Sequence, residues 1–149
     1  QQYQSVDVTV MENVDDAISN ADVIVTATNA TQPVFNKPLD AGVHVNAVGS
    51  FKPDMQELPS HAIANADKVV VEASEAALEE TGDLITPMDE GLFEEKDLYG
   101  ELGEIVGSHL AGRESDDEIT VFKSVGVAIV DIIVANYFYR KAQENNDAL

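Results

Sequence analysis

The chain has 149 residues, of which 44% are hydrophobic, so it is long enough to bury one core and is expected to form a globular domain. Its 28 acidic and 8 basic residues give a formal net charge of -20, which repels phosphate backbones and anionic membranes and makes nucleic acid and membranes unexpected partners. The chain has no cysteine, which excludes disulfides, a thiolate nucleophile and thiolate metal ligands.

Strand and helix patterns alternate along the chain. Strands are predicted where β-branched residues gather, at 6–10, 23–28, 43–48, 68–73 and 119–122. Helices are predicted from capping residues and helical spacing, at 14–20 after Asn13, 60–66, 74–80, 98–110 and 126–144, with a loop at 86–90. The alternation predicts a Rossmann-like three-layer α/β/α fold with a mainly parallel sheet, in which the runs 23–28 and 43–48 are covered on both faces.

The beginning of the chain lacks two expected features. It has neither a signal peptide nor the Gly-x-Gly-x-x-Gly turn that opens a dinucleotide-binding fold, and Gly100, Gly103 and Gly107 lie too late to supply that turn. We therefore expect the fold to be truncated at its N-terminal end and the chain by itself to be inactive. The most apolar run, 125–139, is interrupted by Asp131 and Asn136 and is too short to span a bilayer. A cytoplasmic location is expected.

A polar loop follows the strand at 43–48. Gly49 permits close approach of a ligand to the backbone, and Ser50, Lys52 and Asp54 come directly after it. Ligands of open α/β sheets bind beyond the carboxyl ends of the strands, where this loop is expected. An ordinary Gly/Pro turn explains the same residues equally well.

Three segments together resemble the ornithine cyclodeaminase/mu-crystallin family, in order over nearly the whole chain: ADVIVTAT at 21–28, NAVG at 46–49 and SDDEITVFKSVG at 115–126. The resemblance implies NAD or NADP as cofactor and a small amino or cyclic imino acid as substrate. It implies that residues 1–125 are the later portion of an NAD(P)-binding Rossmann domain. Residues 126–149 would be a long helix returning toward an N-terminal dimerisation domain, so a homodimer is expected.

The resemblance also implies roles for individual residues. It places the nucleotide at Thr28, Val48, Gly49, Ser50, Phe51 and Ser124, and the substrate at Val125. The turn at 123–126 is expected to offer free N–H groups at the start of a helix. From the residues alone, the Thr28 hydroxyl bonds to local backbone instead, and Ser124 is a helix cap. His44, His61 and His109 lack metal-ligand spacing and are interpreted as structural, so no metal site is expected.

Position 51 bears on the reaction. The family's cyclodeaminases place a proton-shuttling Asp two residues after Gly49 and a Lys four residues beyond it, where this chain has Phe51 and Met55. Neither side chain transfers a proton. The Ser-Phe-Lys-Pro-Asp-Met form resembles the branch of mu-crystallin and the ketimine and pyrroline-2-carboxylate reductases, which makes Lys52 and Asp54 candidate catalytic residues, although a solvated turn explains both. A reductase is expected; the alternatives are an ornithine cyclodeaminase and a nucleotide-binding protein without turnover.

Overall fold

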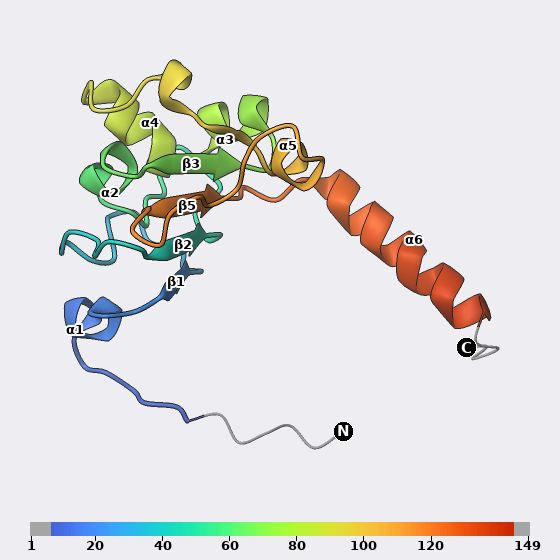
Figure 1. The fold of residues 1–149 in the computed structure, drawn as a ribbon, viewed down its shortest axis with the longest axis horizontal. Helices are drawn as coiled ribbons and strands as arrows, with labels where there is room; N and C mark the ends of the chain where they lie inside the picture. The colour runs from blue at the N-terminus through green and yellow to red at the C-terminus, as the bar shows by residue number, and fades with distance from the viewer. Residues whose placement is uncertain (1–6, 145–149) are drawn as a thin grey trace.

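The computed structural model describes residues 7–144, and a five-stranded sheet forms its centre (Figure 1). The strands are β1 (Val23–Thr26), β2 (His44–Ala47), β3 (Lys68–Val71), β4 (Gly100–Glu101) and β5 (Thr120–Lys123). Their order is β1-β2-β5-β3-β4, and every neighbouring pair is parallel. The predicted Rossmann-like parallel sheet is confirmed, and all five strands end at the same edge.

Helices separate most of the strands, as the sequence predicts, although β2 follows β1 without a helix between them. They are α1 (Val14–Ile18), α2 (Ser60–Ala64), α3 (Ser74–Glu80), α4 (Gly82–Asp89), α5 (Leu102–Val106) and α6 (Ala128–Glu144), with a 3-10 turn, η1, at Glu95–Asp97. The Asn13 side chain accepts a hydrogen bond of 2.8 Å from the N–H of Asp15, which confirms the predicted cap of the first helix.

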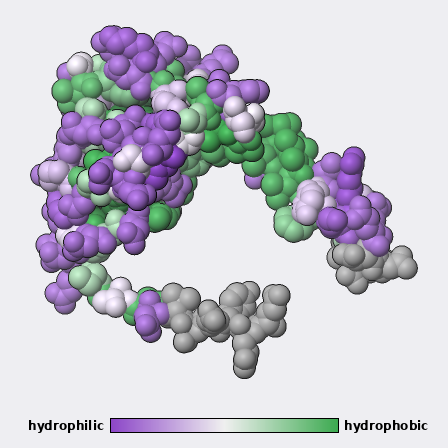
Figure 2. Space-filling model, in the orientation of Figure 1, coloured by the Kyte–Doolittle hydropathy of each residue, from purple (hydrophilic) through white to green (hydrophobic). Residues whose placement is uncertain are grey.

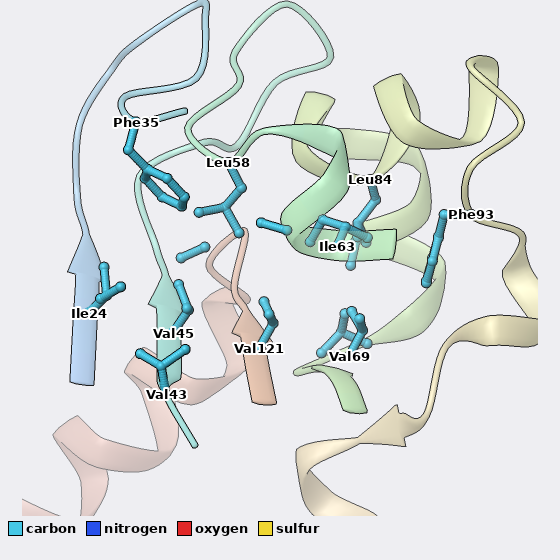
Figure 3. Packing of buried hydrophobic residues seen from close by; sticks show 14 residues of the cluster. Ile24, Phe35, Val43, Val45, Leu58, Ile63, Val69, Leu84, Phe93 and Val121 are labelled. Atoms are coloured by element: carbon cyan, nitrogen blue, oxygen red, sulfur yellow. The ribbon is translucent and has the colours of Figure 1, made fainter. Parts of the chain in front are cut away.

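The core lies on one face of the sheet, between the strands and α2, α3 and α4. Alternate residues of a strand point to the same side, so Ile24, Val45 and Val121 extend together from β1, β2 and β5 toward Leu58 and Ile63 (Figure 3). β3 is buried along its whole length. Burial of this single apolar layer is the main force that holds the sheet to its helices.

The opposite face of the sheet is more open, which corrects one prediction. The sequence predicts that β1 is covered on both faces, but Val23 and Val25 are 57% and 62% exposed. On this face α5 contributes Leu102 and Ile105 to a groove that also contains Val70 of β3. The described residues thus supply helices for one side of β1, and the apolar side chains on its other side remain in contact with solvent.

Three local predictions are wrong. Residues 86–90 are predicted to be a loop, but most of them belong to α4, which contains Pro87 and is capped by the Thr81 hydroxyl. The predicted helix at 98–110 is shortened to α5, because Gly100 and Glu101 pair with β3 as the short strand β4. Residues 7–10 of the predicted first strand are not in a strand; residue 6 lies outside the described residues.

The helix α6 extends away from the sheet (Figure 1), and it has no buried residue. Its large apolar side chains are 46% to 65% exposed, and they form a hydrophobic surface along the half nearer the sheet (Figure 2). Within residues 7–144 no helix has the length and apolar character needed to cross a bilayer. A large exposed apolar patch of this kind is typical of a surface that contacts protein.

Candidate functional site

Four strands end side by side at the carboxyl edge of the sheet. The register places Thr26 beside Ala47, Ala47 beside Lys123, and Lys123 beside Val71. The residues that follow these positions therefore emerge at one edge, where open α/β folds bind ligands. Residues predicted from separate parts of the sequence are brought together in this way: Thr28, Val48, Gly49, Ser124 and Val125.

A buried carboxylate that sequence reasoning missed joins the ends of β1 and β2. Oε2 of Glu57 accepts hydrogen bonds from the Thr26 hydroxyl (3.1 Å) and from the N–H groups of Gly49 (2.8 Å) and Ser50 (3.1 Å), and Oε1 accepts one from the N–H of Thr28 (2.5 Å). Burial alone raises the pKa of Glu57, but these hydrogen bonds outweigh it and hold the pKa below the usual range of a glutamate. The carboxylate is therefore ionised at neutral pH.

The backbone of Glu57 is held in place by the side chain of Asp83. The backbone N–H groups of Glu57 and Leu58 donate to Oδ1 of Asp83 at 2.6 and 2.9 Å. Oδ2 of Asp83 forms an ion pair of 3.0 Å with Nζ of Lys123, the last residue of β5. The side chains of Asp83 and Lys123 are both 0% exposed. A continuous line of polar contacts thus connects the ends of β1, β2 and β5.

A second carboxylate occupies the turn after β5. Glu72, which directly follows β3, accepts hydrogen bonds from the Ser124 hydroxyl and from the N–H groups of Val125 (2.9 Å) and Gly126 (2.6 Å). The sequence predicts that these N–H groups are free to bind an anion or amide, and this is wrong because Glu72 already binds them. The helix α6 begins only at Ala128, so its N-terminus lies beyond this turn.

Two of the predicted nucleotide-contacting side chains are well exposed at this edge. Val48 is 44% exposed and Phe51 is 49% exposed. Thr28 is also exposed, and its hydroxyl accepts a 3.2 Å hydrogen bond from the N–H of Ala30, which is the local bond that the sequence offered as its alternative role. The second lone pair of that oxygen leaves room for a further donor.

Ser50 lies in a different environment from its neighbours. Its side chain is 0% exposed, and its hydroxyl donates to the carbonyl of Met55 and lies 2.6 Å from the hydroxyl of Thr81. In this conformation the side chain fastens the loop to the cap of α4. The whole residue is 0% exposed and its N–H donates to Glu57, so its predicted nucleotide contact remains a prediction.

The candidate catalytic residues Lys52 and Asp54 lie on the exposed surface of the same loop. Nζ of Lys52 lies 5.4 Å from the centroid of the Phe51 ring, a cation–π contact. Within residues 7–144 the Asp54 carboxylate makes no hydrogen bond. Both polar groups are thus available to a ligand, and their catalytic role remains a prediction.

The polar residues that sequence reasoning missed share one property. No spacing rule connects Glu57, Asp83 and Lys123, because Glu57 and Asp83 are 26 residues apart and Asp83 pairs with Lys123 from a different element of the fold. The Thr81-Gly82-Asp83 segment did carry a signal, since Thr81 is a helix cap followed by an acidic first turn. Gly82 is also typical of the end of a helix, so this signal is ambiguous in the sequence.

Comparison with known proteins identifies the family of the chain. The profile of the family described as "Ornithine cyclodeaminase/mu-crystallin family" matches residues 1–146. The chain belongs to this family. The resemblance carried by the segments at 21–28, 46–49 and 115–126 is therefore confirmed.

Several family members are closely similar to the chain. A Delta(1)-pyrroline-2-carboxylate reductase of Bacillus cereus is 68% identical over 135 residues, which cover 91% of this chain and 42% of that protein. The ketimine reductase mu-crystallin of Mus musculus is 38% identical, over 89% of this chain and 40% of that protein. The structure of Thermococcus litoralis Delta(1)-pyrroline-2-carboxylate reductase in complex with NADH and L-proline aligns with a TM-score of 0.84 and 40% identity, over 91% of this chain and 42% of that one. The chain thus spans less than half the length of these relatives.

Proposed function

We propose that the protein containing this chain is an NAD(P)H-dependent reductase of cyclic imino acids, with pyrroline-2-carboxylate as its substrate. The observation that carries this proposal is the 68% identity to the Bacillus cereus Delta(1)-pyrroline-2-carboxylate reductase across 91% of the chain. The Thermococcus litoralis relative was solved with NADH and L-proline, the reduced counterpart of such an imine.

The carboxyl edge of the sheet fits a nicotinamide dinucleotide. Thr28 follows β1 and Val48 follows β2, and both residues are exposed where these two neighbouring strands end. Gly49, the next residue after Val48, is partly exposed there. We assign Thr28, Val48, Gly49, Phe51 and Ser124 to the dinucleotide, with buried Ser50 holding their loop in place, and Val125 to the imino acid. When bound, the dinucleotide supplies the hydride for the imine carbon.

The chain's own residues have to exclude water and provide a proton for the imine nitrogen. Phe51 is an exposed apolar ring at the site edge, suited to covering a reacting carbon. Lys52 and Asp54 are the nearest exposed polar groups in the loop, and we propose them as the source or relay of that proton. We further propose that residues 1–125 complete the dinucleotide-binding domain and that residues 126–149 join it to a dimerisation domain in a cytoplasmic homodimer.

The alternative cyclodeaminase reaction has a different requirement. Conversion of ornithine to proline needs a general acid/base beside the α-carbon while the imine is attacked and ammonia leaves, and a positioned one typically contributes about 100-fold to 10,000-fold. Phe51 occupies the position where the family's cyclodeaminases place that group and has no ionisable atom. This residue favours the reductase.

Steady-state assays of the natural protein that contains this chain test the proposal. Pyrroline-2-carboxylate and piperideine-2-carboxylate are offered with NADH and with NADPH, and ornithine is offered with NAD⁺. We expect imine reduction to be faster than proline formation from ornithine. Efficient ornithine turnover would contradict the reductase assignment, and dinucleotide binding without turnover of any of these substrates would favour the non-catalytic alternative.

A further inference from the structure

The loops that follow β1 and β2 touch at one point, and Glu57 lies at that point. A Cβ atom built on Gly49 would collide with the backbone N and O of Thr28 and with Oε1 of Glu57. The two backbones therefore approach as closely as glycine permits. Three N–H groups from these loops, those of Thr28, Gly49 and Ser50, share the one carboxylate of Glu57 as acceptor.

Glu57 is too enclosed to touch a ligand. It is 0% exposed, and both of its carboxylate oxygens accept hydrogen bonds from the protein. Its backbone is fixed by Asp83, which is in turn paired with Lys123. A side chain held on all sides in this way acts on a ligand only through the residues that it positions.

We propose that Glu57 is a positioning residue for the dinucleotide: its carboxylate fixes the spacing of the Thr28 and Gly49 loops, and this spacing determines dinucleotide affinity. The inference rests on the proposed function, since it requires the dinucleotide to lie at this edge. Without the carboxylate, the three N–H groups lose their common acceptor and the loops lose their fixed separation. Dinucleotide binding must then order the two loops, and the free energy spent on ordering them lowers the affinity for the dinucleotide but not for the imino acid.

The test uses Glu57→Gln in the natural protein that contains this chain. Gln has nearly the same shape but places an NH₂ group among N–H donors, so at least one hydrogen bond is lost. We expect the Kd and the KM of the dinucleotide to rise about 10-fold, equivalent to about 1.4 kcal/mol. The KM of the imino acid and kcat at saturating dinucleotide should change by less than about 2-fold. Glu57→Asp keeps the charge on a shorter side chain and should give an intermediate rise.

A matched control lies at the opposite edge of the same sheet. Asp67 precedes β3, and its carboxylate accepts a 2.8 Å hydrogen bond from the N–H of Ile119, which precedes β5. Asp67→Asn thus perturbs a carboxylate that joins two strand beginnings, and dinucleotide affinity should not change. If Glu57→Gln does not fold, Thr26→Val decides, because it removes a single donor to Glu57 and should raise the dinucleotide KM selectively by about 2-fold to 3-fold.

Three results are distinguishable. A folded Glu57→Gln variant with wild-type dinucleotide affinity overturns the inference, as does an unchanged Thr26→Val variant where that variant has to decide. Equal rises in the KM of dinucleotide and imino acid also overturn it, because they indicate general loosening of the site. A wild-type protein that binds no dinucleotide contradicts the proposed function instead.

Discussion

The ammonium group of Lys123 lies 3.0 Å from the carboxylate of Asp83, and neither side chain has any exposed surface. Among the described residues, Nζ of Lys123 and Oδ2 of Asp83 have no polar partner besides each other. Removing one member of a buried pair leaves an uncompensated charge in a medium of low dielectric constant, which is far more costly than removing both charges. The free energy of unfolding therefore depends on keeping both charges of this pair or neither of them.

Lys123→Met should lower the free energy of unfolding by about 3–5 kcal/mol, because Asp83 is left buried without a counter-charge. Adding Asp83→Asn removes that charge but keeps Oδ1 as acceptor for the N–H groups of Glu57 and Leu58, so the double variant should regain at least about 1 kcal/mol. Urea unfolding followed by circular dichroism measures both values. The exposed ion pair between Lys141 and Glu144 is the control, since Lys141→Met should lower the free energy of unfolding by less than about 1 kcal/mol. If the double variant is no more stable than Lys123→Met alone, the unpaired charge of Asp83 is not the cause of the loss of stability.

The stability contribution of Glu57 should depend on pH. Hydrogen bonds hold the pKa of Glu57 below its ordinary value in the folded state, so protonation favours unfolding. The contribution is therefore fully present above the ordinary glutamate pKa of about 4.3 and is lost as the pH falls through the lower folded-state pKa. The difference in Tm between wild type and Glu57→Gln should be constant from about pH 7 to pH 5 and shrink below about pH 4.

Thermal unfolding at a series of pH values measures this difference. Asp83, which binds the backbone of Glu57, and Lys123, which is paired with Asp83, are both retained in the variant, so their effects largely cancel. Glu79→Gln, at an exposed position of α3, is the control and should show a difference near zero at every pH. A Glu57→Gln difference that grows toward low pH would show that the direction of the pKa shift is wrong.

Phe51→Asp should move the activity toward ornithine. The substitution introduces a carboxylate at the exposed position where the family's cyclodeaminases place their general acid/base. We expect the ratio of ornithine turnover to pyrroline-2-carboxylate reduction to rise by about 10-fold or more. Phe51→Leu removes the ring without adding a proton carrier and should leave the ratio unchanged. An equal response of the two variants would mean that position 51 acts by shape alone.

The chain by itself should self-associate through α6. Ile132 and Phe138 are 64% and 65% exposed on this helix, and burying them between copies removes apolar surface from water. Light scattering should therefore give an average mass that rises with concentration. The Ile132→Gln/Phe138→Gln variant should lower it, whereas Val10→Gln, which replaces an even more exposed valine outside the helix, should not. A monomer over the whole accessible concentration range would contradict the prediction.

The order and type of most elements follow from the sequence alone. Hydrophobic periodicity identifies the four longer strands and the helices α1, α2, α3 and α6, because each pattern is local to one element. The same reasoning fails at α4, where residues 86–90 are predicted to be a loop, and at β4, where pairing with β3 overrides the helical spacing of the glycine-rich segment. The error at β4 comes from pairing with residues distant in the sequence, whereas the Thr81 cap of α4 is a local signal.

At the candidate site, the sequence indicates the exposed residues and only the tertiary structure reveals what holds them. Gly49, Val48 and Thr28 are recognisable because a strand end followed by glycine is a local signal. The carboxylates of Glu57, Asp83 and Glu72 are not recognisable, since a glutamate or aspartate in the sequence gives no sign of whether it faces water or buried donors. Whether such a carboxylate is buried depends on which backbone N–H groups lack a partner where the parallel strands end. This common edge of the strands exists only in the folded chain.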